Sequence, residues 1–407
     1  MVRTYLYPLM LALLTLAVAL PSFDLATYEK PRLEKAAVVA LAAEPKTIVA
    51  ARNPRSAGGL HDFSSEGDYW WPDPKDPAAP YVQRDGLTNP DNFVAHRQLL
   101  LAFVRHFGVL AATYRVTGDE RYAAGAVKHL HAWFVDPTTK MNPNLLYSQA
   151  IKGRSTGRSI GVIDTVHFAE VALGVEALRG SKSLSPAEDT AVTGWFRDYL
   201  TWIRTHPYGV DESNAKNNHG TCWTLQAACF ARLVGDQAVL AECRKRLTEI
   251  HLPNQMAVDG SFPQEVARTK PYGYSIFNLD VMTGLAVALS TPTDNLLAYT
   301  LPDGRSLVKG VAWLAPYLAD KNAWLKEVRK PSSPTAAQAN SKDPIKPDVM
   351  YWDDWPVRQP LLIFGALASD HPQRTAWLAT WKSLNPDPTV EEIIRNLPVR
   401  QPVLWLR

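Results

Sequence analysis

Apolar residues recur at helical spacing along most of the chain, whereas the strict alternation typical of strands is scarce. Between Phe93 and Phe134, one apolar stripe is followed by a turn at Thr117-Gly118-Asp119 and then by a second stripe. The first stripe comprises Leu99, Leu100, Phe103, Val104, Phe107, Leu110 and Ala111, and the second comprises Tyr122, Ala126, Leu130 and Trp133. The segment therefore predicts a hairpin of two antiparallel helices.

The same order of stripe, turn and stripe recurs along the rest of the chain. The pairs are Val162–Leu178 with Pro186–Arg204, Trp223–Leu233 with Val239–Ile250, Ile276–Leu289 with Leu307–Leu318, and Leu361–Leu367 with Arg374–Trp381. A pair cannot bury its apolar stripes alone, so the pairs have to stack side by side. We therefore predict an all-α fold, an (α/α)n toroid or barrel of antiparallel helical hairpins.

The N-terminus has the features of an export signal. Arg3 precedes an apolar run from Leu9 to Leu20 that contains the small-x-small pattern Ala17-Val18-Ala19, and the run is too short to span a bilayer. We predict a signal peptide over residues 1–22 and an exported protein, periplasmic or secreted, with no stable membrane insertion after cleavage. Residues 23–407 are predicted to form a single catalytic toroid domain.

Polar stretches between the helical pairs hold most of the unusual residues, and loops on a rigid scaffold often carry function. An aromatic loop is predicted over residues 60–92, and the proline-rich stretch 330–356 is expected to be a surface insertion. Within the aromatic loop, Tyr69, Trp70 and Trp71 offer rings on which a sugar could stack, although rings that close one end of a toroid would look the same.

The composition narrows the choice of partner. The 407 residues carry 43 Lys and Arg against 40 Asp and Glu, which argues against a protein that binds nucleic acid by bulk charge. Cys222, Cys229 and Cys243 are the cysteines, so no disulfide framework is expected, and we interpret all three as small buried residues. His129 and His131 are two positions apart and cannot share a helix face, so we expect neither a metal site nor a cofactor.

Three polar clusters could carry chemistry. In the run from Asn217 to Trp223, Asn218 and His219 precede an apolar helix, where they could cap the helix or meet an anion at its positive end. Arg268 offers a two-pronged cation for a carboxylate, and Tyr274 offers a phenol six residues later, with Tyr272 as the competing phenol. The third cluster, residues 142–158, is an irregular loop with donors that include Gln149, Arg154 and Arg158.

Taken in order, these runs resemble the alginate-lyase superfamily, the helical toroid enzymes of polysaccharide lyase families five and thirty-eight. The runs are residues 68–74, 117–122, 142–164, 217–223 and 259–278. The six-residue spacing from Arg268 to Tyr274 is closer to family thirty-eight, because family five has a longer one. The resemblance implies an active centre of Asn218, His219, Arg268 and Tyr274. Tyr69, Trp70, Trp71, Gln149, Arg154, Arg158 and Tyr272 are expected to bind substrate.

The expected reaction is β-elimination on a (1,4)-linked uronic-acid polymer, either glucuronan or mannuronate-rich alginate. A site must neutralise the sugar carboxylate before the C5 proton can leave, and Arg268 and Asn218 are suitable donors. In glucuronan and mannuronan the C5 proton and the C4 oxygen lie on the same side, so Tyr274 could act as base and then as acid. In guluronan they lie on opposite sides, and His219 would take the proton. The sequence does not distinguish between these two routes.

Two other functions fit the same pattern. An inverting glycoside hydrolase would need two carboxyl groups about 6.5–9.5 Å apart. The candidates are Asp211, Glu212, Asp259 and Glu265, although Glu265 could instead hold Arg268 in place. A non-catalytic exported protein could use the same aromatic and arginine residues only to bind glycans. In each case the expected partner is an acidic polysaccharide, and we expect a monomer or a weak oligomer.

Overall fold

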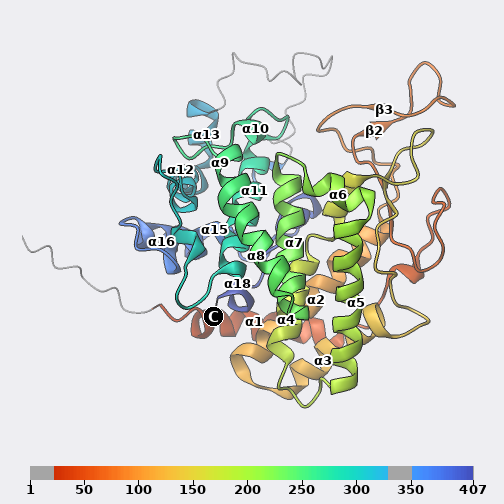
Figure 1. The fold of residues 1–407 in the computed structure, drawn as a ribbon, viewed down its shortest axis with the longest axis horizontal. Coiled ribbons are helices and arrows are strands. Elements are labelled where there is room, and N and C mark those ends of the chain that lie inside the picture. Colours follow the sequence, from red (N-terminus) through yellow and green to blue (C-terminus); the bar gives the residue numbers. More distant parts are fainter. Residues whose placement is uncertain (1–22, 329–350, 407) are drawn as a thin grey trace, which may run out of the picture.

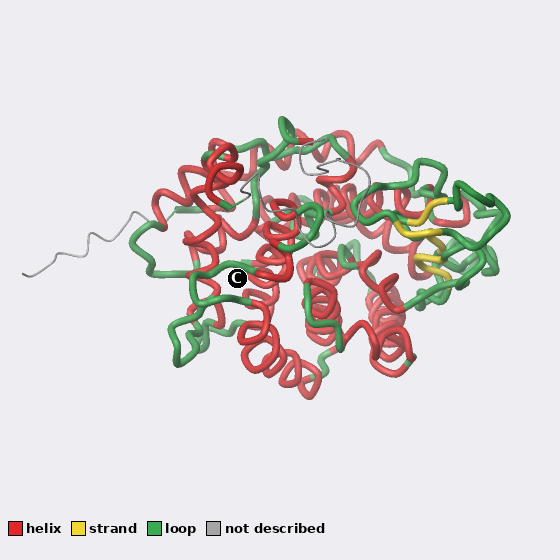
Figure 2. The backbone as a smooth tube through the Cα atoms, turned by 90° about the horizontal axis from the view of Figure 1, so that it is seen from above, coloured by secondary structure: helices red, strands yellow, loops and turns green. Residues whose placement is uncertain are grey.

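The computed structural model describes residues 23–328 and 351–406. The predicted signal peptide and residues 330–350 of the predicted insertion lie outside these ranges. Five inner helices contact one another in chain order and curve around a common centre (Figures 1 and 2). They are α2 (Ala95–Thr117), α4 (Phe168–Leu178), α7 (Asn218–Val234), α11 (Pro271–Leu289) and α15 (Pro360–Leu367).

Each inner helix is followed in the chain by a helix of an outer layer. The outer helices are α3 (Glu120–Leu130), α5 (Pro186–Thr205), α8 (Gln237–Lys245), α12 (Leu307–Ala319) and α16 (Arg374–Ser383). These are the five pairs that the apolar stripes predict, so the all-α toroid of hairpins is confirmed. The sequence pattern did not predict α1 (Leu25–Ala42), which packs against α2.

Shorter elements connect the pairs. The helical ones are η1 (Ile48–Ala50), η2 (His131–Val135), η3 (Ser159–Thr165), α6 (Pro207–Ser213), η4 (Arg246–His251), α9 (Leu252–Gln255), α10 (Pro263–Val266), η5 (Leu296–Ala298), α13 (Lys321–Glu327), α17 (Glu391–Arg395) and α18 (Pro402–Trp405). The strands are β1 (Ser64–Glu66), parallel to β4 (Tyr147–Ala150), and β2 (Trp70–Trp71), antiparallel to β3 (Val82–Gln83). The predicted aromatic loop therefore contains three short strands, too short to leave an alternating pattern.

Local sequence signals set the ends of the helices. Ser185 caps α5 by accepting a hydrogen bond from the Glu188 backbone N–H, and its hydroxyl donates back to the Glu188 carboxylate. Pro186 occupies the first turn, where no N–H is needed. At the other end of a helix, Gly118 follows α2 with φ 69°, a conformation that glycine adopts without strain.

Most of the long apolar helices are core. By length and composition α2 is the one described helix that could cross a membrane, but 61% of its most apolar window is buried inside the fold. We therefore interpret it as a core helix. All three cysteines are free and buried, as the sequence predicted.

The C-terminal helix α18 fills the centre of the toroid at one end, where it contacts four inner helices: α2, α4, α11 and α15. Glu170 of α4 holds this segment in place. One of its carboxylate oxygens accepts hydrogen bonds from the Arg400 N–H at 2.8 Å, the Gln401 N–H at 2.9 Å and the Trp405 indole N–H at 2.9 Å. Gly284 of α11 lets Val399 of this segment approach closely, because an added Cβ would lie 3.1 Å from the Val399 side chain.

We expect Glu170→Ala to destabilise the fold by about 3 kcal/mol or more, because three buried donors lose their acceptor and each unpaired group costs about 1–3 kcal/mol. Urea denaturation would measure this as a lower free energy of unfolding. Glu170→Gln keeps an acceptor of similar size and should cost clearly less. Wild-type stability in the Ala variant would contradict the role assigned to Glu170.

Candidate active site

A cleft of about 190 Å³ lies at the end of the toroid away from α18. Four inner helices begin at this cleft, each contributing residues at or just before its N-terminus. They are Arg97 and Leu101 of α2, Val166 and His167 ahead of α4, Asn218 and His219 of α7, and Gly273, Tyr274 and Phe277 of α11. Helix N-termini carry partial positive charge, so the cleft is suited to an anionic ligand.

Asn218 is held by a buried carboxylate. The Glu265 carboxylate accepts the Asn218 backbone N–H at 2.9 Å and the side-chain amide at 2.8 Å. Burial raises the pKa of Glu265, although these hydrogen bonds and the charges of Arg268 and His219 act in the opposite direction. The bonds fix the amide group and leave its second N–H for a ligand.

His219 is held in a similar way. Its Nδ1 lies 2.6 Å from the buried Glu212 carboxylate, so Nε2 is the ring nitrogen left for the cleft. Burial on its own would lower the pKa of His219, but the charge and hydrogen bond of Glu212 outweigh it and raise that pKa. The pair therefore resembles a histidine base oriented by a carboxylate.

Arg268 and Tyr274 are in direct contact. Arg268 Nη2 donates a hydrogen bond to the Tyr274 hydroxyl at 2.9 Å, and the guanidinium carbon lies 4.1 Å from the ring centroid. The Tyr274 hydroxyl also lies 3.0 Å from the Tyr69 hydroxyl, which comes from the aromatic loop. Burial and Tyr69 raise the pKa of Tyr274 well above its usual value, and they outweigh the opposing charge of Arg268. Tyr274 is therefore a neutral phenol in the free protein.

The aromatic loop also brings the carboxylate of Asp85 against the guanidinium of Arg268. Asp85 Oδ1 lies 3.3 Å from Arg268 Nη2, and Asp85 Oδ2 accepts the Thr269 hydroxyl at 3.0 Å. Asp85 thus occupies part of the donor surface that a substrate carboxylate would use. A bound carboxylate has to replace Asp85 or take the remaining donors of the guanidinium.

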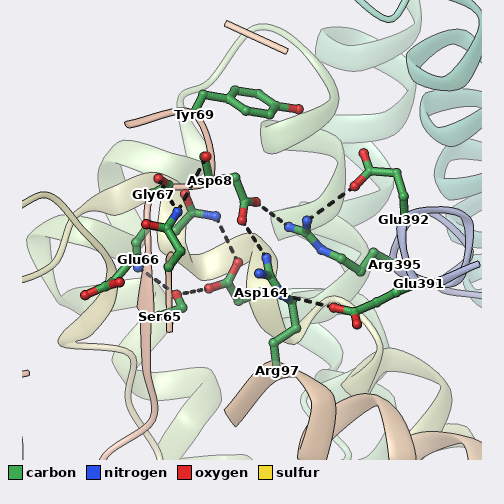
Figure 3. Close-up of polar contacts among 12 residues, drawn as sticks. Ser65, Glu66, Gly67, Asp68, Tyr69, Arg97, Asp164, Glu391, Glu392 and Arg395 are labelled. Atoms are coloured by element: carbon green, nitrogen blue, oxygen red, sulfur yellow. Dashed lines mark hydrogen bonds and ion pairs between the residues drawn. The ribbon is translucent and has the colours of Figure 1, made fainter. Parts of the chain in front are cut away.

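A network of buried charges joins the two ends of the chain beside the cleft (Figure 3). Asp68, which directly precedes Tyr69, pairs with Arg97 at 2.8 Å and with Arg395 of α17 at 2.6 Å. Next to it, Lys270 pairs with Glu392 at 2.7 Å. Both arginines lower the pKa of Asp68 in spite of its burial, so it stays ionised.

These charged residues line the cleft, and sequence reasoning did not select them. The missed residues are Asp68, Asp85, Arg97, Asp164, Lys270, Glu392 and Arg395. Partners such as Asp68 and Arg395 are too far apart in the chain for spacing to connect them. The one available signal is the position of Asp68, Asp85, Asp164 and Lys270 within segments already selected for other residues.

The predicted substrate-binding residues separate into two groups. Tyr69, Trp70, Gln149 and Arg158 line the cleft. Gln149 adopts φ 53° and connects Asp164 to Arg158, its amide donating to the carboxylate and its carbonyl oxygens accepting from the guanidinium. Burial lowers the pKa of Arg158.

Trp71, Arg154 and Tyr272 do not line the cleft. The Trp71 indole N–H donates to the Leu87 carbonyl, and the Arg154 guanidinium lies over the outer face of the Trp70 ring system, 5.2 Å from its centroid. Tyr272 is fully buried among Trp324, Trp352 and Trp355, and its hydroxyl donates to the Tyr317 carbonyl. The competing phenol is therefore part of the core, and the prediction that it contacts substrate is not supported by its position.

Two further expectations need correction. Glu265, for which holding Arg268 was one alternative, binds Asn218 instead, because the turn before α7 places the Asn218 N–H groups against it. Residues 351–356 are the part of the predicted surface insertion that the structure describes. They do not lie only on the surface, because Tyr351 and Trp355 line the cleft.

The four carboxylates considered for a hydrolase do not face one another across the cleft. Asp211 and Asp259 are outside it, and Glu212 and Glu265 are bonded to His219 and Asn218 behind it. No group of three His, Cys, Asp or Glu side chains within the described ranges is placed to hold a metal ion.

Comparison with known proteins agrees with this geometry. A family profile described as alginate lyase matches residues 47–324. The solved structure of an alginate lyase from Bacteroides ovatus is 29% identical, with a TM-score of 0.71 and 93% of each chain covered. Alginate lyase A1-III of Sphingomonas species A1, in complex with a tetrasaccharide, is 14% identical with a TM-score of 0.54, and 92% of this chain and 94% of that chain are covered. That likeness concerns the fold alone. Curated protein sequences give no match.

The profile spans more than half of the chain. The chain therefore belongs to the alginate lyase family and is a polysaccharide lyase. This assignment agrees with a cleft that has carboxylate-backed donors and a phenol, and it sets aside both the hydrolase and the non-catalytic glycan-binding protein.

We expect Glu212→Gln to lower the pKa of His219 by about 1–3 units, the usual effect of an adjacent opposite charge. Without the Glu212 charge, burial and Arg268 both favour the neutral ring, so the direction is downward. NMR titration of the His219 ring would measure the shift. The same titration in Asp211→Asn, a neighbouring acid outside the cleft, is the control and should show no change.

Proposed function

We propose that this polysaccharide lyase cleaves (1,4)-linked uronate polymers of the alginate or glucuronan type by β-elimination, leaving a C4–C5 double bond in the product. The observation that carries the proposal is the contact of Arg268 with the Tyr274 hydroxyl, beside Asn218 and His219 in one cleft. The convergent helix N-termini and the charge of Arg268 favour a sugar that carries a carboxylate.

Elimination first requires the carboxylate charge to be neutralised. While the carboxylate is ionised, the neighbouring C5 proton is very weakly acidic. The guanidinium of Arg268 and the free N–H of Asn218 are fixed donors for that carboxylate and for the negative charge that develops on it as C5 loses its proton. Removal of one such donor typically costs about 10²–10³ in rate.

The protonation states indicate which side chain is the acid and which is the base. Tyr274 is neutral at rest and holds the proton that the C4 oxygen needs as it leaves. Glu212 raises the pKa of His219, which makes the neutral ring a stronger base for the C5 proton. This pairing serves guluronate, in which the C5 proton and the C4 oxygen lie on opposite sides of the ring.

Cleavage at mannuronate or glucuronate uses the same residues, but Tyr274 is then both the base and the acid. The C5 proton and C4 oxygen of these sugars lie on one side, so Tyr274 first loses its own proton to solvent, then takes the C5 proton as a phenolate and passes it to the leaving C4 oxygen. Arg268 stabilises the phenolate, while burial and Tyr69 oppose it. We propose that the cleft supports both routes and that the chain acts outside the cytoplasm after loss of its signal segment, where such polymers occur.

We expect Tyr274→Phe to reduce product formation by at least about 10²-fold, within the range usual for loss of an acid–base group. Binding of polymer should be nearly unchanged, because the aromatic ring remains. Ultraviolet absorbance of unsaturated uronides would follow turnover on polymannuronate, polyguluronate and glucuronan. Tyr299→Phe, an exposed position, is the matched control. Full turnover by Tyr274→Phe would remove the phenol from the mechanism.

His219→Ala should separate the two routes. We expect loss of activity on polyguluronate by about 10²–10⁴-fold, and a much smaller loss on polymannuronate, because His219 is the base only in the first case. In the wild type, polyguluronate turnover should rise as pH rises through the raised pKa of His219, since the neutral ring is the active form. An equal loss on both polymers would contradict the two-route proposal.

A further inference from the structure

A second cavity, of about 330 Å³, lies beside the C-terminal helix α18 and shares no lining residue with the cleft. We call it the rear cavity. It is bounded by α1, by the middle of α2 and by the segment from Pro386 to Pro402. On α2 it begins at Arg105, four residues beyond Leu101 of the cleft, which is about 6 Å along a helix. Its volume is within the range usual for ligand pockets.

The rear cavity has more positive than negative charge. Arg32 and Arg358 share the buried carboxylate of Glu29, at 2.6 and 2.9 Å, and Arg32 also pairs with Asp387 at 3.2 Å. Arg105 and Arg400 also line the cavity, and neither forms an ion pair with an acid in the described part of the chain. Burial lowers the pKa of Arg400 to about 10 and outweighs the opposing charge of Glu170, while Arg105 acts in the same direction as burial. A cation in this state gains stability from an added anion.

Two buried donors in the wall lack acceptors. Arg358 Nε and the Trp381 indole N–H have no hydrogen-bond partner within the described residues, and the Trp381 side chain is 1% exposed. Buried N–H groups are rarely left unpaired. Both atoms lie beneath the cavity surface, so they add to its positive potential without contacting a ligand directly. The same wall is rigid, because the Arg358 guanidinium lies 4.5 Å from the Trp381 ring centroid.

The remaining lining indicates the shape of the ligand. Val39, Val109, Pro388 and Leu397 add apolar surface to the lining. Inorganic phosphate has no apolar part to contact it. A sugar acid has a carboxylate for the arginines, hydroxyls for the polar side chains of Asp387 and Thr389, and C–H faces for the apolar residues.

We propose that the rear cavity is a second binding site for a uronate sugar, separate from the cleft. The choice of a uronate rests on the proposed function, because cleavage of the polymer supplies such groups, whereas the anion preference rests on the arginines alone. The site holds one terminal or free uronate residue and takes no part in elimination.

Calorimetric titration with sodium D-glucuronate, D-glucose and inorganic phosphate tests this. The titrations use an Arg268→Ala chain, so that the cleft lacks its main cation. We expect saturable binding of glucuronate, and at least about tenfold weaker binding of both glucose and phosphate. Adding Arg105→Gln should weaken glucuronate binding by about tenfold or more, in line with loss of a charged hydrogen bond. Arg197→Gln, an exposed arginine of α5, should leave it unchanged.

No binding of glucuronate, equal binding of glucose, or equal binding of phosphate would each overturn the proposal. Unchanged binding after both Arg105→Gln and Arg400→Gln would do the same. Because the assay measures binding in a chain with a disabled cleft, its result is independent of turnover. A wild-type chain that binds glucuronate here and cleaves no uronate polymer would refute the proposed function and leave the rear site in place.

Discussion

The structure depends on one electrostatic arrangement: four inner helices begin at a single cleft, so their positive ends point at the same small volume. The positive potential in this volume is unfavourable unless negative charge lies nearby. The carboxylates of the chain supply part of that negative charge, and an anionic ligand can supply the rest. This explains why a chain with almost balanced overall charge can form a site for an acidic sugar.

Three carboxylates near this volume are satisfied by donors other than lysine or arginine. Glu265 accepts the backbone N–H and one amide N–H of Asn218, Glu212 contacts the imidazole of His219, and Asp164 accepts the Ser65 hydroxyl and the Gln149 amide. Each of these three acids therefore fixes a donor group in one orientation. The same principle holds Glu170 against α18 at the other end, so a single kind of interaction secures both the frame and the cleft.

Helical periodicity was sufficient to predict the toroid, because each inner helix buries a stripe that repeats locally. The meeting of Asn218, His219, Arg268 and Tyr274 in one cleft was predicted as well, because each pair lies within a short run. Contacts between distant segments could not be predicted. Nothing in the sequence connects Asp68 to Arg395, or shows that Tyr272 turns into an aromatic core while Tyr274, two positions later, turns into the cleft. The balance of pKa effects on Tyr274 also depends on burial, which only coordinates reveal.

The cleft takes side chains from nearly the whole length of the chain, from Asp68 to Asn396. Because Arg395 and Glu392 complete the pairing of Asp68 and Lys270, the charge network beside the cleft stays incomplete until this segment has been made. The cleft is therefore assembled only once the chain extends to Asn396. A polypeptide that ended before Glu392 would lose both of these ion pairs together with α18, which closes the other end, so turnover itself reports that this part of the chain is present.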